Sequence, residues 1–427
     1  MRIKQRLILL FFSFVILLTI VVISFVKMRS DMQESTQTDN ISVDEESYAD
    51  TVAVQDSEPE NIKEAEPDPE SLSEESDKKV QEIIQAMSTE EKVAQLFFIT
   101  PEALTGYQTV TAAGDTTKLA LQEYPVGGIV YFAQNLVDPQ QTQKMLENVQ
   151  SYAMQTQGIP VFLGVDEEGG RVLRVGSNAA FSVEHVDAMG ELAKEQNAAD
   201  VIYHAGDTIG AYLSALGFNV DFAPDVDVLV NADNQVIGDR SFGDDPELVA
   251  DMAWSFAQGL HNNQILACYK HFPGHGGTIA DSHTGAAYLD RTLEELSQTE
   301  LVPFADGSRK GIDFIMVAHI SDREVTVGSE EPASLSSVFV TDILRGELEY
   351  NGIIITDSLS MGAVTGHYNS GEAAVLAVQA GCDMLLMPQD FQAAYQAVLN
   401  AVEDGTISEE RLNESVERIV GAKIGRM

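Results

Sequence analysis

From about residue 77 onward, short apolar runs rich in branched side chains alternate with longer stretches that have helical periodicity. The runs begin at Gln95, Gly127, Val161, Phe218, Ile265, Asp313, Gly352 and Asp383. The helical stretches, with apolar residues three and four apart, include 139–157, 188–216, 246–263 and 292–310. Strand and helix repeated about eight times predict a parallel sheet, and this number favours a closed (β/α)8 TIM-like barrel forming one catalytic domain. An open, doubly wound sheet is the alternative.

Residues 1–29 contain an apolar run, from Leu7 to Val26, that carries no charged side chain. A helix of this length, at about 1.5 Å per residue, is long enough to span a bilayer. Basic residues precede the run, so the positive-inside rule predicts a cytoplasmic amino terminus. We therefore expect a transmembrane signal anchor, in a single-pass protein of the cell membrane with an extracellular catalytic domain. A cleaved signal peptide, which would leave the protein secreted, is the alternative.

Residues 30–77 are rich in Asp, Glu, Ser, Thr, Gln and Pro, with Lys63 as their only base. Such a segment buries too little apolar surface to offset its chain entropy, so we expect a disordered acidic linker, followed by the catalytic domain at 78–427. The formal net charge of the whole chain is −42. Because nucleic-acid binding requires basic patches, which the sequence lacks, we expect no nucleic-acid partner.

Polar residues follow the apolar runs at the places where strands should end. In a (β/α)8 barrel the carboxyl ends of the strands meet at one face, and the chemistry takes place there. The residues at these positions are Asp166, Asp225, Asp227, Lys270, His271, His319 and Asp357. Any one of them could be a cap or turn residue, but together they predict an active site.

The stretch "KHFPGHGGTIADSH", from Lys270 to His283, combines three histidines with three glycines. Its histidines have no regular spacing of the kind that zinc sites use, and the phosphate-loop order is absent. We therefore expect no metal and no cofactor. Asp281, two residues before His283, can accept a hydrogen bond from the imidazole, which predicts a loop that carries a general acid/base.

Five motifs together resemble those of glycoside hydrolase family 3, in particular its β-N-acetylhexosaminidase (NagZ-like) branch. They are "KHFPGHGGT…DSH", "VDEEGGRV" from Val165, "IGDRSFG" from Ile237, "MVAHI" from Met316 and "IIITDSLSMGA" from Ile353. The likeness extends from Ser88 to near the carboxyl terminus, with the motifs in the order that the family shows.

The resemblance implies specific roles for residues of this chain. Asp357 matches the nucleophile that forms a covalent glycosyl-enzyme, so the reaction should retain anomeric configuration. His283, partnered by Asp281, matches the acid/base of this branch. The residues that match the binding site for the terminal GlcNAc are Asp166, Arg240, Lys270 and His271.

The resemblance and the expected location together predict a carbohydrate substrate. We expect a retaining exo-β-N-acetylglucosaminidase that removes terminal β-GlcNAc from peptidoglycan fragments such as GlcNAc-MurNAc saccharides and muropeptides. A β-glucosidase or glycoside phosphorylase of the same family is one alternative. A non-catalytic saccharide-binding protein of the cell surface is the other.

Overall fold

The structure, a computed structural model, describes residues 69–278 and 287–426. The predicted membrane anchor, most of the predicted linker, and both Asp281 and His283 lie outside the described residues. Within 69–278 and 287–426, no helix has both the length and the apolarity that crossing a bilayer requires.

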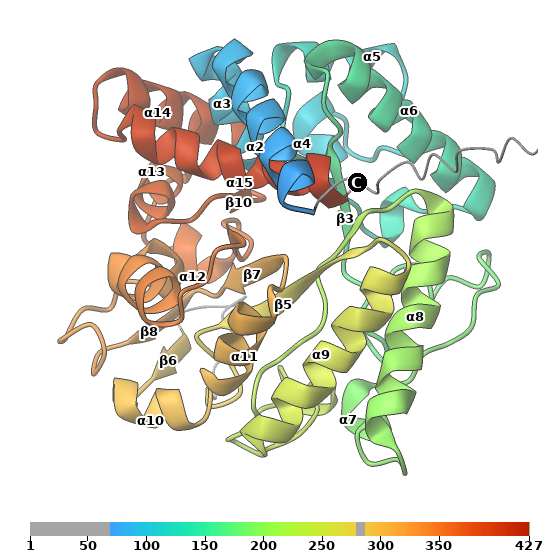
Figure 1. Ribbon diagram of the computed structural model, residues 1–427, viewed down its shortest axis with the longest axis vertical. Helices are drawn as coiled ribbons and strands as arrows, with labels where there is room; N and C mark the ends of the chain where they lie inside the picture. Colours follow the sequence, from blue (N-terminus) through green and yellow to red (C-terminus); the bar gives the residue numbers. More distant parts are fainter. Residues whose placement is uncertain (1–68, 279–286, 427) are drawn as a thin grey trace, which may run out of the picture. The chain divides into compact units, whose positions relative to one another are not determined.

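Eight parallel strands form the centre of the fold (Figure 1). In sequence order they are β1 (Phe97–Ile99), β2 (Gly128–Val130), β3 (Phe162–Val165), β4 (Val220–Asp221), β5 (Leu266–Phe272), β7 (Phe314–Val317), β9 (Ile353–Thr356) and β10 (Leu385–Leu386). From β1 to β9 each strand pairs with the next, and β1 also pairs with β10, with Phe97 opposite Leu385. A parallel bridge between Ile355 and Met384 links β9 to β10 and completes a nearly closed barrel. The barrel prediction is confirmed, and each of the eight apolar runs contributes one strand.

Helices cover the outside of this barrel (Figure 1). They include α3 (Thr89–Gln95), α5 (Asp115–Glu123), α6 (Pro139–Gln157), α8 (Ala198–Leu216), α9 (Pro246–Asn262), α11 (Val302–Lys310), the π-helix η4 (Val338–Glu347), α13 (Ser370–Ala380) and α14 (Phe391–Glu403). Local sequence explains their limits. Helix α6, for example, begins where the Asp138 carboxylate accepts a hydrogen bond from the Gln141 amide at 2.8 Å, and it ends at Gly158, which has a φ of 72°.

Two of the predicted helical stretches are broken. Within 188–216, a short helix α7 (Met189–Leu192) precedes α8, because Asn197 between them adopts a left-handed conformation with a φ of 62°. Within 292–310, α10 (Leu293–Gln298) ends before α11 begins with Pro303 in its first turn. Two short strands that the sequence did not predict, β6 (Ala287–Leu289) and β8 (Ile320–Asp322), form a separate parallel pair.

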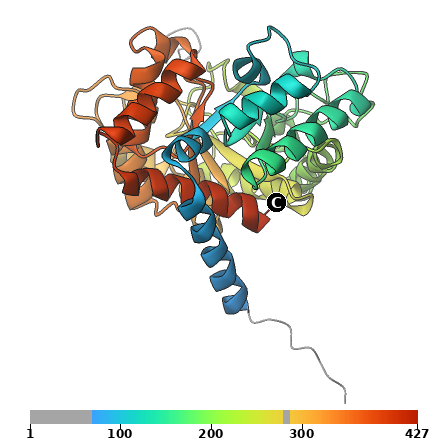
Figure 2. The same ribbon diagram turned by 90° about the horizontal axis from the view of Figure 1, so that it is seen from above.

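Helices α2 (Pro69–Ala86) and α15 (Glu409–Arg426) pack against each other (Figure 2). Val80 and Ile84 on α2 are buried. The sequence of the helix before them is acidic, and acidic residues near the amino terminus stabilise a helix. The predicted boundary between linker and barrel, at 77/78, therefore falls inside a helix.

Aromatic rings fill the barrel interior. The ring centroids of Phe98 and Phe222 are 5.0 Å apart, and those of Phe162 and Phe314 are 5.3 Å apart, both in edge-to-face arrangements. Gly128 permits this packing, because a Cβ there would lie 2.4 Å from the Phe98 ring. At the amino ends of the strands, Lys423 of α15 is buried with its Nζ 2.7 Å from Gln95 Oε1 and 5.0 Å from the Phe162 ring centroid.

Candidate active site

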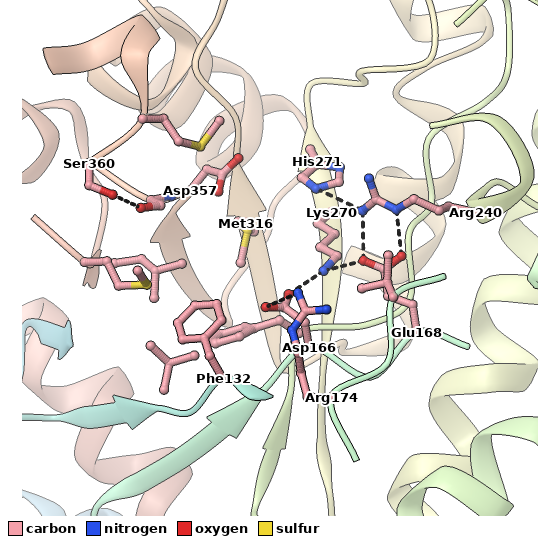
Figure 3. A pocket seen from close by; sticks show the side chains of 17 residues that line it. Phe132, Asp166, Glu168, Arg174, Arg240, Lys270, His271, Met316, Asp357 and Ser360 are labelled. Carbon is pink, nitrogen blue, oxygen red and sulfur yellow. Dashed lines mark hydrogen bonds and ion pairs between the residues drawn. The ribbon is translucent and has the colours of Figure 1, made fainter. Parts of the chain in front are cut away.

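A pocket of about 510 Å³ opens at the carboxyl ends of the strands (Figure 3). Its charged lining consists of three acids and four potential cations: Asp166, Glu168, Asp357, Arg174, Arg240, Lys270 and His271. Much of the rest is apolar and includes Phe132, Met316, Met361, Leu386 and Met387. A concave site with an apolar wall and a few converging charges is suited to a ligand that has both a carbon face and many hydroxyl groups.

Lys270 forms the centre of a buried charge network (Figure 3). Its Nζ lies 2.8 Å from Asp166 Oδ1 and 2.6 Å from Glu168 Oε1. Although burial lowers the pKa of Lys270, these two carboxylates raise it above the ordinary lysine value. Lys270 therefore remains a cation and can donate hydrogen bonds to ligand oxygens.

Arg240 approaches the same glutamate from the other side. Its Nε donates to Glu168 Oε2 at 2.7 Å and its Nη2 to Glu168 Oε1 at 2.8 Å. Burial raises the pKa of Glu168, but the two cations outweigh it and hold that pKa well below its usual range. Arg240 Nη2 is also 3.1 Å from Asp225 Oδ2, a second buried carboxylate. The arginine is held on both sides, so its guanidinium is preorganised for binding a polar ligand.

Consecutive residues of β5 both face the pocket. Side chains normally alternate along a strand, so Lys270 and His271 should point in opposite directions. However, Lys270 is opposite Met316 whereas Phe272 is opposite Val317, so the register between β5 and β7 shifts by one residue at this point. An extra residue of this kind redirects side chains, and both Lys270 and His271 line the pocket as a result.

Asp357 lies on the opposite side of the pocket, at the end of β9 (Figure 3). Its Oδ1 accepts a hydrogen bond from the Ser358 amide at 2.6 Å. The buried His319 supports this turn, with Nε2 2.9 Å from the Ser358 carbonyl oxygen and Nδ1 2.7 Å from Ser334 Oγ. His319 does not line the pocket but holds the backbone that carries Asp357.

The structure therefore brings five of the predicted site residues into one pocket: Asp166, Arg240, Lys270, His271 and Asp357. Asp281 and His283 lie outside the described residues, so their placement stays a prediction. The roles of all seven also stay predictions.

The sequence analysis missed Glu168. Glu167 and Glu168 are adjacent, but only Glu168 lines the pocket. Glu167 turns away and accepts hydrogen bonds from the Gly176 amide at 2.6 Å and from Tyr212 Oη at 2.8 Å. Residues 166–168 follow the end of β3, and continuing the alternation of that strand through them would have placed Asp166 and Glu168 on one side and Glu167 on the other.

Among the residues that the structure describes, Asp225, Asp227 and His271 form one group with the spacing of metal ligands, their ligand atoms lying within 4.8 Å of one another. These atoms are already engaged by protein groups. Asp227 Oδ2 is 2.7 Å from His271 Nδ1, and Asp225 Oδ2 is next to the Arg240 guanidinium. A cation here would have to compete with Arg240 and to displace the imidazole from Asp227, so the group fits an ion-pair network better than a metal centre.

Comparison with known proteins identifies the family. Residues 88–422 match the model of the glycosyl hydrolase family 3 N terminal domain. The chain is 33% identical to Beta-hexosaminidase A of Pseudoalteromonas piscicida over 326 residues, which is 71% of this chain and 54% of that protein. It is 37% identical to Beta-hexosaminidase of Tolumonas auensis over 288 residues, or 66% of this chain and 81% of the other.

A solved structure gives the same result. The glycoside hydrolase family 3 beta-N-acetylglucosaminidase of Paenibacillus sp. str. FPU-7 superposes with a TM-score of 0.74 at 37% identity, covering 80% of this chain and 63% of the other. This chain thus spans a little over half of Beta-hexosaminidase A and under two thirds of the Paenibacillus enzyme. With a family model matched across the whole barrel, the chain belongs to glycosyl hydrolase family 3.

Proposed function

We propose that the protein is a retaining exo-β-N-acetylglucosaminidase that hydrolyses terminal β-GlcNAc. The beta-hexosaminidase names of its relatives support this activity, as does the name of the Paenibacillus structure. The observation that carries the proposal is the arrangement of the pocket. A network of buried charges around Lys270 faces a single carboxylate, Asp357, across a cavity lined with apolar groups (Figure 3).

The two sides of the pocket suit two parts of a sugar. Asp166, Glu168, Arg240 and Lys270 offer paired acceptors and donors for the hydroxyls of a terminal ring. We infer that binding of these hydroxyls directs the anomeric carbon toward Asp357, the nucleophile of the proposed reaction. The Ser358 amide, which donates to Asp357 Oδ1, holds the carboxylate in one orientation for attack.

The proposed mechanism has two steps. Asp357 displaces the leaving group and forms a covalent glycosyl ester, and water then hydrolyses that ester with overall retention. His283, partnered by Asp281, would protonate the departing oxygen in the first step and deprotonate the water in the second.

The proposal extends to the substrate and the location. We infer that the natural substrates are GlcNAc-terminated peptidoglycan fragments. We also infer that residues 1–29 anchor the protein in the cell membrane, with the barrel outside the cell or secreted if the anchor is cleaved. Product analysis on purified muropeptides tests the substrate, because it identifies the bond that is cleaved, the sugar that is released and the tolerance for stem peptides.

The activity is tested with p-nitrophenyl β-N-acetylglucosaminide. We expect turnover by the wild type and a loss of roughly 10³-fold or more in D357N, because the amide cannot act as the nucleophile. We expect a loss of about 10²-fold or more in H283A. Full activity of D357N would remove Asp357 from the mechanism.

The same assay separates the alternatives. Preference for the aryl glucoside would indicate a glucosidase, and a requirement for phosphate would indicate a phosphorylase. Binding of GlcNAc with no turnover of any aryl glycoside would indicate a saccharide-binding protein.

A further inference from the structure

One buried carboxylate, that of Asp227, contacts two residues that have different tasks. Its Oδ2 lies 2.7 Å from His271 Nδ1. Its Oδ1 accepts hydrogen bonds from the His275 amide at 2.5 Å and from the His271 amide at 3.3 Å. Asp227 follows β4 and is fully buried, so it does not itself line the pocket.

His271 is the partner on the pocket side. It lines the cavity, and its Nε2 lies 3.4 Å from Arg240 Nη2, next to the charges that would hold the sugar. Burial by itself lowers the pKa of His271, but Asp227 outweighs this effect and raises it. With Nδ1–H donated to Asp227, Nε2 is the atom that His271 presents to a ligand.

His275 is the partner on the loop side. Residues 275–278 form a tight turn in which His275 Nδ1 lies 2.6 Å from Thr278 Oγ1 and the Thr278 amide donates to the His275 carbonyl at 3.1 Å. Asn234 Nδ2 donates to the same carbonyl at 2.9 Å. This turn directly precedes 279–286, the part of the sequence that contains Asp281 and His283.

The turn is also pressed against the segment that carries Asp227. The Asn231 amide donates to the Gly276 carbonyl at 3.1 Å, and a Cβ on Gly276 would lie 1.8 Å from the Val228 carbonyl oxygen. Because this close contact and the hydrogen bond join the two segments, we expect a shift of the Asp227 carboxylate to move the start of the turn as well.

We propose that Asp227 is a positioning residue that couples sugar binding at His271 to the placement of the turn at His275–Thr278, from which the chain continues to the acid/base. This inference rests on the proposed function. It predicts that occupancy of the pocket and the geometry of proton donation depend on one another, with Asp227 as the link.

Kinetics with a series of aryl β-N-acetylglucosaminides, whose phenols differ in pKa, tests the proposal. Loss of a sugar contact lowers kcat/KM for every leaving group equally. Misplacement of the proton donor lowers it mainly for poor leaving groups, by up to roughly 10²-fold, because good leaving groups depart without protonation. We therefore expect a uniform loss in H271Q and a loss confined to poor leaving groups in T278V.

Two substitutions of Asp227 give different expected profiles. D227A removes both acceptor oxygens and should show both kinds of loss. D227N keeps one acceptor for the His275 amide but places an NH₂ group opposite His271, so it should resemble H271Q. A D227A profile parallel to that of the wild type would show that Asp227 has no role in proton donation, and would overturn the proposal.

Amide hydrogen exchange provides a test that needs neither turnover nor the alanine variant. Addition of GlcNAc should slow the exchange of the His275–Thr278 amides at least several-fold in the wild type but not in D227N. Bound GlcNAc without this protection contradicts the coupling.

Failure of the proposed function would look different. In that case the wild type would neither bind GlcNAc nor cleave its aryl glycosides. The leaving-group series and the exchange measurement would then use the sugar that the wild type does bind, and the expectations for Asp227 would be unchanged.

Discussion

The two ends of the barrel each bury a lysine, and the two lysines have opposite pKa shifts. At the carboxyl end, Lys270 lies between the carboxylates of Asp166 and Glu168, and its pKa is raised. At the amino end, Lys423 has the amide oxygen of Gln95 as its hydrogen-bond partner and forms no ion pair with any described residue. Burial lowers the pKa of Lys423 to about 7. Both side chains are equally removed from water, so the partner groups determine which lysine keeps its charge.

The two lysines therefore differ in role: Lys270 supplies a charge to the pocket, whereas Lys423 is a structural side chain. Lys270 remains a cation at the place where a sugar would need a donor. Lys423 is buried at the amino ends of the strands, where its Nζ lies over the Phe162 ring and donates a hydrogen bond to Gln95. Four substitutions test this difference, from the largest expected effect to the smallest.

K270M should have the largest effect. It leaves the Asp166 and Glu168 carboxylates without their shared cation, which should lower the free energy of unfolding by about 3–5 kcal/mol. It should also lower kcat/KM by at least about 10²-fold, because a preorganised donor is lost. Urea unfolding and the aryl-glycoside assay measure the two losses. Retention of both properties would mean that Lys270 is no more important than Lys423.

K423M should have the opposite effect on stability. Because the folded pKa of about 7 lies below the ordinary value of 10.5, the contribution of Lys423 to stability is fully present above pH 10.5. This contribution declines as the pH falls from 10.5 to about 7, and it is constant at lower pH. We expect K423M to raise the free energy of unfolding by about 2–4 kcal/mol at pH 6, and by less at pH 9. An equal gain at both pH values would show that Lys423 does not titrate in this range.

Substitution of Gln95 should have a smaller effect. Gln95 Oε1 accepts from Lys423, and Gln95 Nε2 donates to the Pro125 carbonyl. Q95L therefore leaves buried polar groups without partners and should cost about 1–3 kcal/mol. In a K423M background part of that cost should disappear, and a double-mutant cycle of unfolding free energies measures the difference. Strict additivity would argue against the Gln95–Lys423 contact.

K78M is the control at the surface. Lys78 lies on α2, 3.9 Å from Glu82, and the two side chains are 78% and 67% exposed. Water screens such a pair, so the substitution should change the free energy of unfolding by less than about 0.5 kcal/mol at either pH. A larger change would mean that loss of lysine charge is costly wherever it occurs, and would weaken the comparison between Lys270 and Lys423.

The sequence predicted the barrel because the apolar runs that build its strands are local signals. Each run is continuous and rich in branched side chains, and residues such as Asp166 and Asp357 mark the positions where strands end. Apolar periodicity alone did not reveal the breaks at Asn197 and between α10 and α11, although the polar run 194–197 and Pro303 lie at these two breaks.

The sequence was less informative about which polar residues meet. Glu168 and Asp227 were visible in the sequence, but their partners come from β5 and from the loop of Arg240, far away along the chain. The register shift between β5 and β7 depends on the pairing of two strands, so neither strand alone predicts that Lys270 and His271 both reach the pocket.

The pairing of β1 with β10 has a consequence for synthesis of the chain. Leu386 and Met387, which line the pocket, lie in and directly after the last strand, and that strand pairs with the first. During translation β1 leaves the ribosome long before β10 has been synthesised, so this edge of the sheet stays unpaired until then. A polypeptide that stalls before residue 385 would contain the Lys270 charge network and Asp357 but could not assemble a complete binding cavity.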